Sequence, residues 1–127
     1  MTDRVALAIV GSVGFTNPDW RDMATDIVEH WLERLDPALV VSGGADGIDT
    51  LGVELACKWG IEPRVHLPKN KLWAPDGYKD RNLLIARDCT HLLAIRCVDS
   101  RTYGSGWTAD RAEEMGRRVR RYTLPAA

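Results

Sequence analysis

The residues of this sequence that could do chemistry are concentrated in three glycine-containing stretches. They read GSVGFTN (residues 11–17), SGGADGID (42–49) and YGSGWTAD (103–110), and each lies between an apolar run and a predicted helix. Helix N-termini present unpaired N–H groups and the positive end of the helix dipole, and glycine lets an anion approach that backbone closely. The pattern therefore favours a phosphate or a nucleotide as ligand.

The same glycines also have a structural explanation, because a tight strand-to-helix turn needs glycine wherever the backbone takes angles that a Cβ forbids. The sequence lacks both the Walker A lysine pattern and a G-x-G-x-x-G run, which disfavours a P-loop NTPase or an ordinary dinucleotide dehydrogenase. We expect the three stretches to meet at one crevice, and this convergence favours ligand binding. The small residues that we expect to line it are Gly11, Gly14, Gly43, Gly44, Ala45, Gly47, Gly104 and Gly106.

Side chains in these stretches add hydroxyl groups and aromatic rings. The hydroxyl donors are Ser12, Ser42, Ser105 and Thr108. Phe15 and Trp107 carry rings that can stack on a base, and Trp107 is the stronger candidate because a large apolar residue is unusual in such a turn. Packing against the core is the alternative for both rings.

Charged and amide side chains stand near two predicted helix starts. The guanidinium of Arg81 can bind a phosphate or carboxylate through two parallel hydrogen bonds, or it can form a surface ion pair with Asp80. Asn82 either faces the ligand or caps the backbone. Asp49 either orients a ribose hydroxyl or stabilises the N-terminus of its own helix.

Apolar runs and helical patterns alternate along the chain and must position these residues. Runs that are apolar at every position suit strands covered on both faces, and apolar residues spaced by three and four indicate amphipathic helices. The predicted strands are 5–10, 38–41, 63–67, 91–95 and 119–124. The predicted helices are 17–36, 48–59, 78–88 and a last one that follows a loop to about residue 106 and ends near 116.

This alternation predicts an α/β fold with three layers, in which helices cover both faces of a mainly parallel five-stranded sheet. The economical strand order is 3-2-1-4-5. In that order, the strands before the three glycine-containing stretches are neighbours. Ligands in open α/β sheets bind outside the carboxyl ends of the strands, where the strand order reverses.

Composition and charge restrict the ligands, cofactors and cellular locations that the sequence predicts. The chain of 127 residues has a formal net charge of −1, whereas proteins that grip nucleic-acid phosphates are usually basic. RRVRR (117–121) is a local basic cluster, which we interpret as a charged edge strand rather than a nucleic-acid site. The cysteines and histidines lack ligand spacing, so we expect no metal and no cofactor. We also expect no membrane span, no secretion signal and a cytoplasmic location.

Three segments resemble signature motifs of the SLOG superfamily, which includes the DNA-processing protein A (Smf) family and the lonely-guy phosphoribohydrolases. They are VVSGGADGIDTLGVELA (40–56), KDRNLLIARDCTHLLAI (79–95) and GSGWTADRAEEMG (104–116). The resemblance implies one Rossmann-like nucleotide-binding domain over residues 1–127, and a homodimer. The motif match implies these ligand-binding residues: Gly43, Gly44, Gly47, Asp49, Arg81, Asn82, Gly104, Ser105, Gly106 and Thr108.

One departure from the superfamily bears on activity. The phosphoribohydrolases carry P-G-G-x-G-T-x-x-E, whose glutamate serves catalysis, and Arg111 stands at that position here. We therefore expect a module that senses or sequesters a nucleotide or nucleotide-derived ligand. A nucleotide hydrolase of the phosphoribohydrolase or N-glycosidase kind is the alternative, and its candidate catalytic residues are Asp49, Arg81, Asp110 and Glu113. A small single-stranded DNA-binding domain is a further alternative, which the near-neutral charge disfavours.

Overall fold

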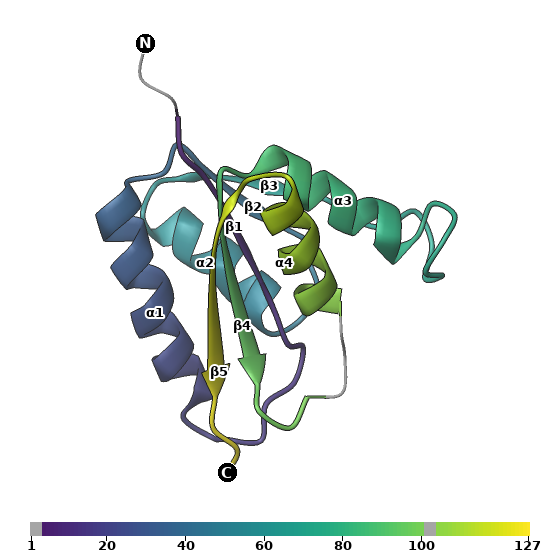
Figure 1. Cartoon of the computed structure of the whole chain (residues 1–127). Helices are drawn as coiled ribbons and strands as arrows, with labels where there is room; N and C mark the ends of the chain where they lie inside the picture. The colour runs from purple at the N-terminus through teal and green to yellow at the C-terminus, as the bar shows by residue number, and fades with distance from the viewer. Residues whose placement is uncertain (1–3, 101–103) are drawn as a thin grey trace.

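Strands and helices alternate along the whole of the computed structural model, which describes residues 4–100 and 104–127 (Figure 1). The strands are β1 (Ala6–Gly11), β2 (Leu39–Ser42), β3 (Glu62–Val65), β4 (His91–Cys97) and β5 (Arg118–Leu124). The helices are α1 (Trp20–Leu35), α2 (Ile48–Lys58), α3 (Tyr78–Asp88) and α4 (Gly104–Glu114).

The strands form one sheet in the order β3-β2-β1-β4-β5, and every pairing between them is parallel. This confirms the predicted three-layer α/β fold and its strand order. β1 lies at the centre, where Ala8 pairs with Val41 of β2 on one side and with Leu92 of β4 on the other. The strand order reverses between β1 and β4, so a crevice is expected at the carboxyl ends of these two strands.

Two hydrophobic cores lie on opposite faces of the sheet, and β1 contributes to both. Leu7 and Ile9 pack with α1 and α2, whereas Ala8 and Val10 pack with α3 and α4. Successive side chains of a strand point to opposite faces, so an unbroken apolar run is what a doubly covered central strand requires. Figure 1 shows α1 and α2 on one side of the sheet and α3 and α4 on the other.

The third glycine-containing stretch differs from its prediction. Instead of continuing as a loop to about residue 106, the chain begins α4 at Gly104, so the residues from Gly104 to Trp107 form the first turn of that helix. Glycine costs about 1 kcal/mol in a helix relative to alanine. The burial of Thr108, Ala109 and Ala112 against the sheet offsets this cost. Tyr103, the first residue of the stretch, lies outside the described residues.

Candidate functional site

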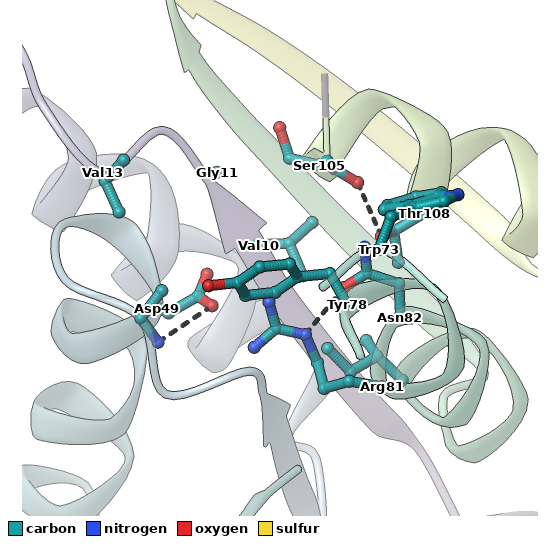
Figure 2. Close-up of a pocket in the computed structure, with 13 residues that line it drawn as sticks. Val10, Gly11, Val13, Asp49, Trp73, Tyr78, Arg81, Asn82, Ser105 and Thr108 are labelled. Atoms are coloured by element: carbon teal, nitrogen blue, oxygen red, sulfur yellow. Dashed lines mark hydrogen bonds between the residues drawn. The ribbon is translucent and has the colours of Figure 1, made fainter. Parts of the chain in front are cut away.

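A cavity of about 410 Å³ lies at the carboxyl end of β1, between the start of α2 and the N-terminal turns of α3 and α4 (Figure 2). This is the crevice that the strand order predicts. Many of the sequence-predicted site residues meet there. Those that line the cavity are Gly11, Ala45, Asp49, Arg81, Asn82, Gly104, Ser105 and Thr108.

Asp49 places a carboxyl group at one side of this cavity, and its side chain is only 6% exposed. Burial raises the pKa of Asp49 to about 6, because removal from water disfavours the charged form. The backbone N–H of Ala45, whose nitrogen lies 3.4 Å from Oδ2, acts against this rise. The Arg81 guanidinium and the N–H groups of Gly11 and Gly43 also lower the pKa of Asp49. The carboxyl therefore changes its protonation state close to neutral pH.

Arg81 reaches the cavity from the first turns of α3 and is held by the protein at two of its nitrogens. Nη1 donates to the Gly43 carbonyl oxygen at 2.6 Å, and Nε donates to Oδ1 of Asn82 at 2.8 Å. Its guanidinium carbon also lies 5.4 Å from the centre of the Tyr78 ring. Nη2 has no hydrogen-bond acceptor within residues 4–100 and 104–127. The guanidinium is therefore fixed in direction and retains donors for a ligand.

The N-terminus of α4 differs from those of α2 and α3. At the start of α2, the N–H groups of Ile48 and Thr50 donate to the carbonyl oxygens of Ser12 and Ala45. The first N–H groups of α3 likewise donate to loop carbonyl oxygens, including that of Leu72. For the first turn of α4, the described part of the chain provides no such acceptor. The residues directly before this turn, 101–103, lie outside the described residues. The positive end of the α4 dipole lies at the cavity, where it favours an anion.

The protein's own packing explains several glycines of the SGGADGID stretch. A Cβ on Gly43 would lie 2.6 Å from Nη1 of Arg81 and 2.7 Å from Oδ2 of Asp49. Gly47 has a φ of +80°, and its Cβ would lie 2.4 Å from the Ser12 carbonyl oxygen. Gly44 also has a positive φ of +73°. These glycines allow side chains and loops of the same chain to approach, and this accounts for them without a ligand.

Ser12 and Ser42 are buried and hold the loops in place instead of facing the cavity. The hydroxyl of Ser42 donates to the Asp49 carbonyl oxygen at 3.0 Å and accepts the Gly44 N–H at 3.2 Å. The Ser12 hydroxyl accepts the backbone N–H of Cys97 at 3.0 Å. Both side chains fix the backbone that surrounds the cavity, so their contribution to binding is indirect.

The remaining predicted ligand-binding residues lie beside the cavity or away from it. The Phe15 ring stacks on Trp20 with centroids 4.6 Å apart, next to the core under α1, and Gly14 lies in the same exposed loop. Gly106 and Trp107 belong to the first turn of α4 but do not line the cavity. The Trp107 ring contacts Trp73 edge to face, with centroids 5.1 Å apart.

Asp110 and Glu113, two of the candidate catalytic residues, do not reach the cavity. Both carboxylates bind the Arg121 guanidinium of β5 on the exposed side of α4. Because α4 begins at Gly104, its helical phase turns Thr108 toward the cavity and these two acids toward β5. Asp49 and Arg81 are thus the candidate catalytic residues that the structure brings together.

Sequence reasoning missed several residues that line the cavity: Val10, Val13, Trp73, Tyr78 and Ile85. Figure 2 shows the Tyr78 ring extending from α3 across the cavity toward Asp49. Tyr78 stands three residues before Arg81, so helical spacing from that arginine could have found it. Trp73 comes from the long loop before α3, and no local pattern predicts its position. Among the residues described, no group of three or more His, Cys, Asp or Glu side chains is placed to hold a metal ion.

Two solved structures share this fold. The chain superposes on DNA processing protein A (DprA) from Streptococcus pneumoniae with a TM-score of 0.71 and 21% identity, over 98% of this chain and 51% of that chain. For the structural-genomics target TM1055, the TM-score is 0.66 at 16% identity, over 92% of this chain and 72% of that chain. The chain thus spans about half the length of DprA. Neither a protein-family profile nor a curated protein sequence matches it.

These likenesses establish the fold class. The protein has a Rossmann-like three-layer α/β fold, which it shares with both of these structures, and the strand order is the one that its sequence predicts. No helix in residues 4–100 and 104–127 is long and apolar enough to cross a membrane.

Proposed function

We propose that the cavity at the carboxyl end of β1 binds a nucleotide or nucleotide-derived ligand. The observation that carries the proposal is that the N-terminal turn of α4 lines the same cavity as Arg81 and Asn82. An anion placed there would receive backbone N–H groups from one side and a guanidinium from the other. The likeness in fold to a DNA processing protein supports a ligand of nucleotide chemistry.

The cavity walls suggest how such a ligand would lie. The volume of the cavity, about 410 Å³, falls in the range of small-molecule sites, roughly 300–1,000 Å³. A phosphate would occupy the space between Ser105 and Nη2 of Arg81, and Asn82 would add an amide donor. The rings of Trp73 and Tyr78 offer apolar surface for a base. Asp49 would then accept a hydrogen bond from a ribose hydroxyl.

A second candidate function is hydrolysis of the bound nucleotide, and Asp49 is the observation that favours it. A buried carboxyl whose pKa is raised to about 6 can act as general acid or base near neutral pH. This function predicts turnover that Asp49→Asn abolishes while the ligand still binds. The proposal of binding alone predicts no turnover in either protein.

The test of binding is thermal melting against a panel of nucleotides, with substitutions at Ser105 on the first turn of α4. A ligand at about 100 times its Kd should raise the melting temperature by roughly 10 °C. Ser105→Glu places a carboxylate where the ligand's phosphate would bind, so the shift should disappear. Ser105→Gln is the matched control, since it adds similar bulk without charge, and it should retain most of the shift.

The Ser105→Glu protein should itself remain folded, because an acidic residue at a helix N-terminus stabilises the helix by about 0.5 kcal/mol. A shift that is equal in the Glu and Gln variants would contradict binding at α4. No shift with any nucleotide would remove the proposal of a small nucleotide ligand.

We also propose, from the family resemblance, that the protein forms a homodimer. A face rich in exposed apolar side chains is available on the segment after β3 and on α3. Leu67 is 68% exposed, Leu72 60% and Leu84 43%. Such an apolar surface is typical of a protein–protein contact.

A further inference from the structure

A second cavity, of about 500 Å³, lies at the opposite end of the sheet from the first. Its lining comes from the C-terminal half of α1 and from the first residues of β4 and β5. Figure 1 shows α1 on the left of the molecule. Trp31 and Arg34 come from α1, His91 begins β4, and Arg118 and Arg120 come from β5. These residues are distant in sequence and meet only through the fold.

The ionisable side chains that line this second cavity are all basic, and no aspartate or glutamate is among them: Arg34, Arg118, Arg120, His30 and His91. Burial and the neighbouring Arg118 lower the pKa of His91, so the positive charge comes from the three arginines. Within the described residues, none of these arginines has a carboxylate within ion-pair distance. By contrast, Arg21, Arg64, Arg111 and Arg121 all bind carboxylates. The cavity thus gathers uncompensated positive charge in a protein whose net charge is −1.

Two of the guanidiniums lie near the ring of the tryptophan that lines this cavity. The guanidinium carbons of Arg34 and Arg120 lie 6.0 and 5.7 Å from the Trp31 ring centre. The Trp31 indole is itself anchored, because Nε1 donates to the Tyr122 hydroxyl at 2.8 Å. Arg118 stands two residues before Arg120 on the same face of β5, with its Cα paired to His91 of β4. All three arginines line one cavity, and two of them contact an anchored ring.

The arginines of the RRVRR cluster (117–121) contact different parts of the molecule, because successive side chains of a strand point to opposite faces. Arg121 turns to the α4 side and binds Asp110 and Glu113, while Arg117, just before β5, donates to the carbonyl oxygens of Ala86 and Arg87. Arg118 and Arg120 line the second cavity, and within residues 4–100 and 104–127 neither pairs with a carboxylate. Protection of an edge strand by charge does not require the charges to converge on one cavity. A ligand that neutralises them explains the convergence.

We propose that this second cavity binds phosphate groups. Several guanidiniums held around one space match the tetrahedral oxygens of phosphate and its derivatives, each of which can accept paired N–H donors. The volume is larger than one phosphate needs, so it suits a chain of phosphates, either in a free polyphosphate compound or in a single nucleic-acid strand. The site is independent of the proposed nucleotide site, because the two cavities lie at opposite ends of the strands.

The test is calorimetric titration with tripolyphosphate, carried out in the Ser105→Glu background to suppress anion binding at the first cavity. The informative variant is Arg118→Gln/Arg120→Gln, which removes two charges and keeps much of each side-chain stem. The control is Arg87→Gln/Arg96→Gln, which removes the same charge at exposed positions that do not line this cavity. Affinity should fall about tenfold for each cavity arginine removed and stay within about twofold in the control.

A second titration with a twelve-residue oligothymidylate distinguishes the source of the phosphate. Binding of either probe that weakens only in the cavity variant supports the proposal, and steep salt dependence with the oligonucleotide assigns it to a strand. Equal affinity in both variants, or no binding of either probe, would overturn it. If the double variant unfolds, Arg118→Gln alone provides a third measurement. Arg118 stacks on no ring among the described residues, so its replacement leaves the contacts of Trp31 in place.

Discussion

At the residue scale, Asp49 occupies the place that the glycine-rich pattern suggests for a ligand. The N–H of Ala45 donates to this carboxyl, and the N–H groups of Gly11 and Gly43 lower its pKa, so the loop after β2 already holds an acidic group of the protein itself. A phosphate could not share that loop with an ionised carboxylate without strong repulsion. The positive end of α4 and the Arg81 guanidinium, which line the same cavity, are instead the groups placed to bind a phosphate.

Loss of the Asp49 proton should lower the free energy of unfolding as the pH rises. The folded-state pKa of about 6 lies above the ordinary aspartate pKa of 3.8, so the folded protein binds this proton more tightly than the unfolded chain does. The resulting stabilisation is full below about pH 4 and is lost as the pH rises through 6. Two pKa units correspond to roughly 3 kcal/mol. Asp49→Asn should remove this pH dependence, as measured by urea unfolding between pH 4 and 7.5.

Asp46→Asn is the control for this experiment, because Asp46 is exposed in the same loop. It should leave the pH dependence of the unfolding free energy as it is in the unaltered protein. An identical slope in the Asp49→Asn and Asp46→Asn proteins would mean that the Asp49 carboxyl is ionised in the folded state throughout this pH range.

At the element scale, the backbone at the ends of each helix determines whether that helix can bind a ligand and whether its last turn is strained. α4 begins within its glycine run, at the edge of the first cavity, whereas the first N–H groups of α2 and α3 donate to loop carbonyl oxygens. α1 ends at Asp36, which has left-handed backbone angles of φ 46° and ψ 59° and donates its N–H to the Leu32 carbonyl oxygen. Glycine is the residue that usually takes this conformation, since a Cβ is strained there.

Asp36→Gly should therefore stabilise the protein by about 1 kcal/mol. It relieves the left-handed strain and removes a negative charge from the negative end of the helix dipole. Asp26→Gly is the matched control, because Asp26 is exposed in the middle of α1, where glycine costs about 1 kcal/mol. The midpoints of thermal unfolding should shift in opposite directions, and a decrease in both would show that α1 does not end at Asp36 in solution.

At the scale of the whole molecule, the sheet has a distinct chemistry at each end. The carboxyl ends of the strands carry the cavity with Asp49 and Arg81, and the amino ends carry the cavity lined by arginines. The exposed leucines lie on a third region, along α3 and the loop before it. That region is free to form a contact between two copies without covering the arginine-lined cavity.

Sedimentation velocity should show a dimer at micromolar concentration that depends on this apolar face. Leu67→Glu/Leu72→Glu introduces charge at two highly exposed leucines and should give a monomer without loss of the folded state. Val98→Glu is the control, since Val98 is 50% exposed at the end of β4, and it should leave the dimer intact. A monomer in the unaltered protein at all concentrations would contradict the homodimer.

The sequence by itself determined the fold. Unbroken apolar runs such as residues 5–10 encode a strand buried on both faces, and apolar residues spaced by three and four encode the covering helices. Short right-handed connections then leave few strand orders, and the predicted one is observed. The positions of Asp49, Arg81 and Ser105 at one crevice follow from that order, because all three stand shortly after neighbouring strands or at the starts of the adjoining helices.

Only the tertiary structure decided which of these residues face a cavity and what they contact there. The start of α4 at Gly104 set the phase that turns Asp110 and Glu113 toward Arg121, and no local pattern fixes a helix start to within a residue or two. The path of the loop before α3 brought Trp73 to the site, and strand alternation with the packing of α1 gathered Arg34, Arg118 and Arg120. The periodicity of apolar residues predicts whether a side chain is buried. The residues that this side chain contacts depend on how the fold brings distant segments of the chain together.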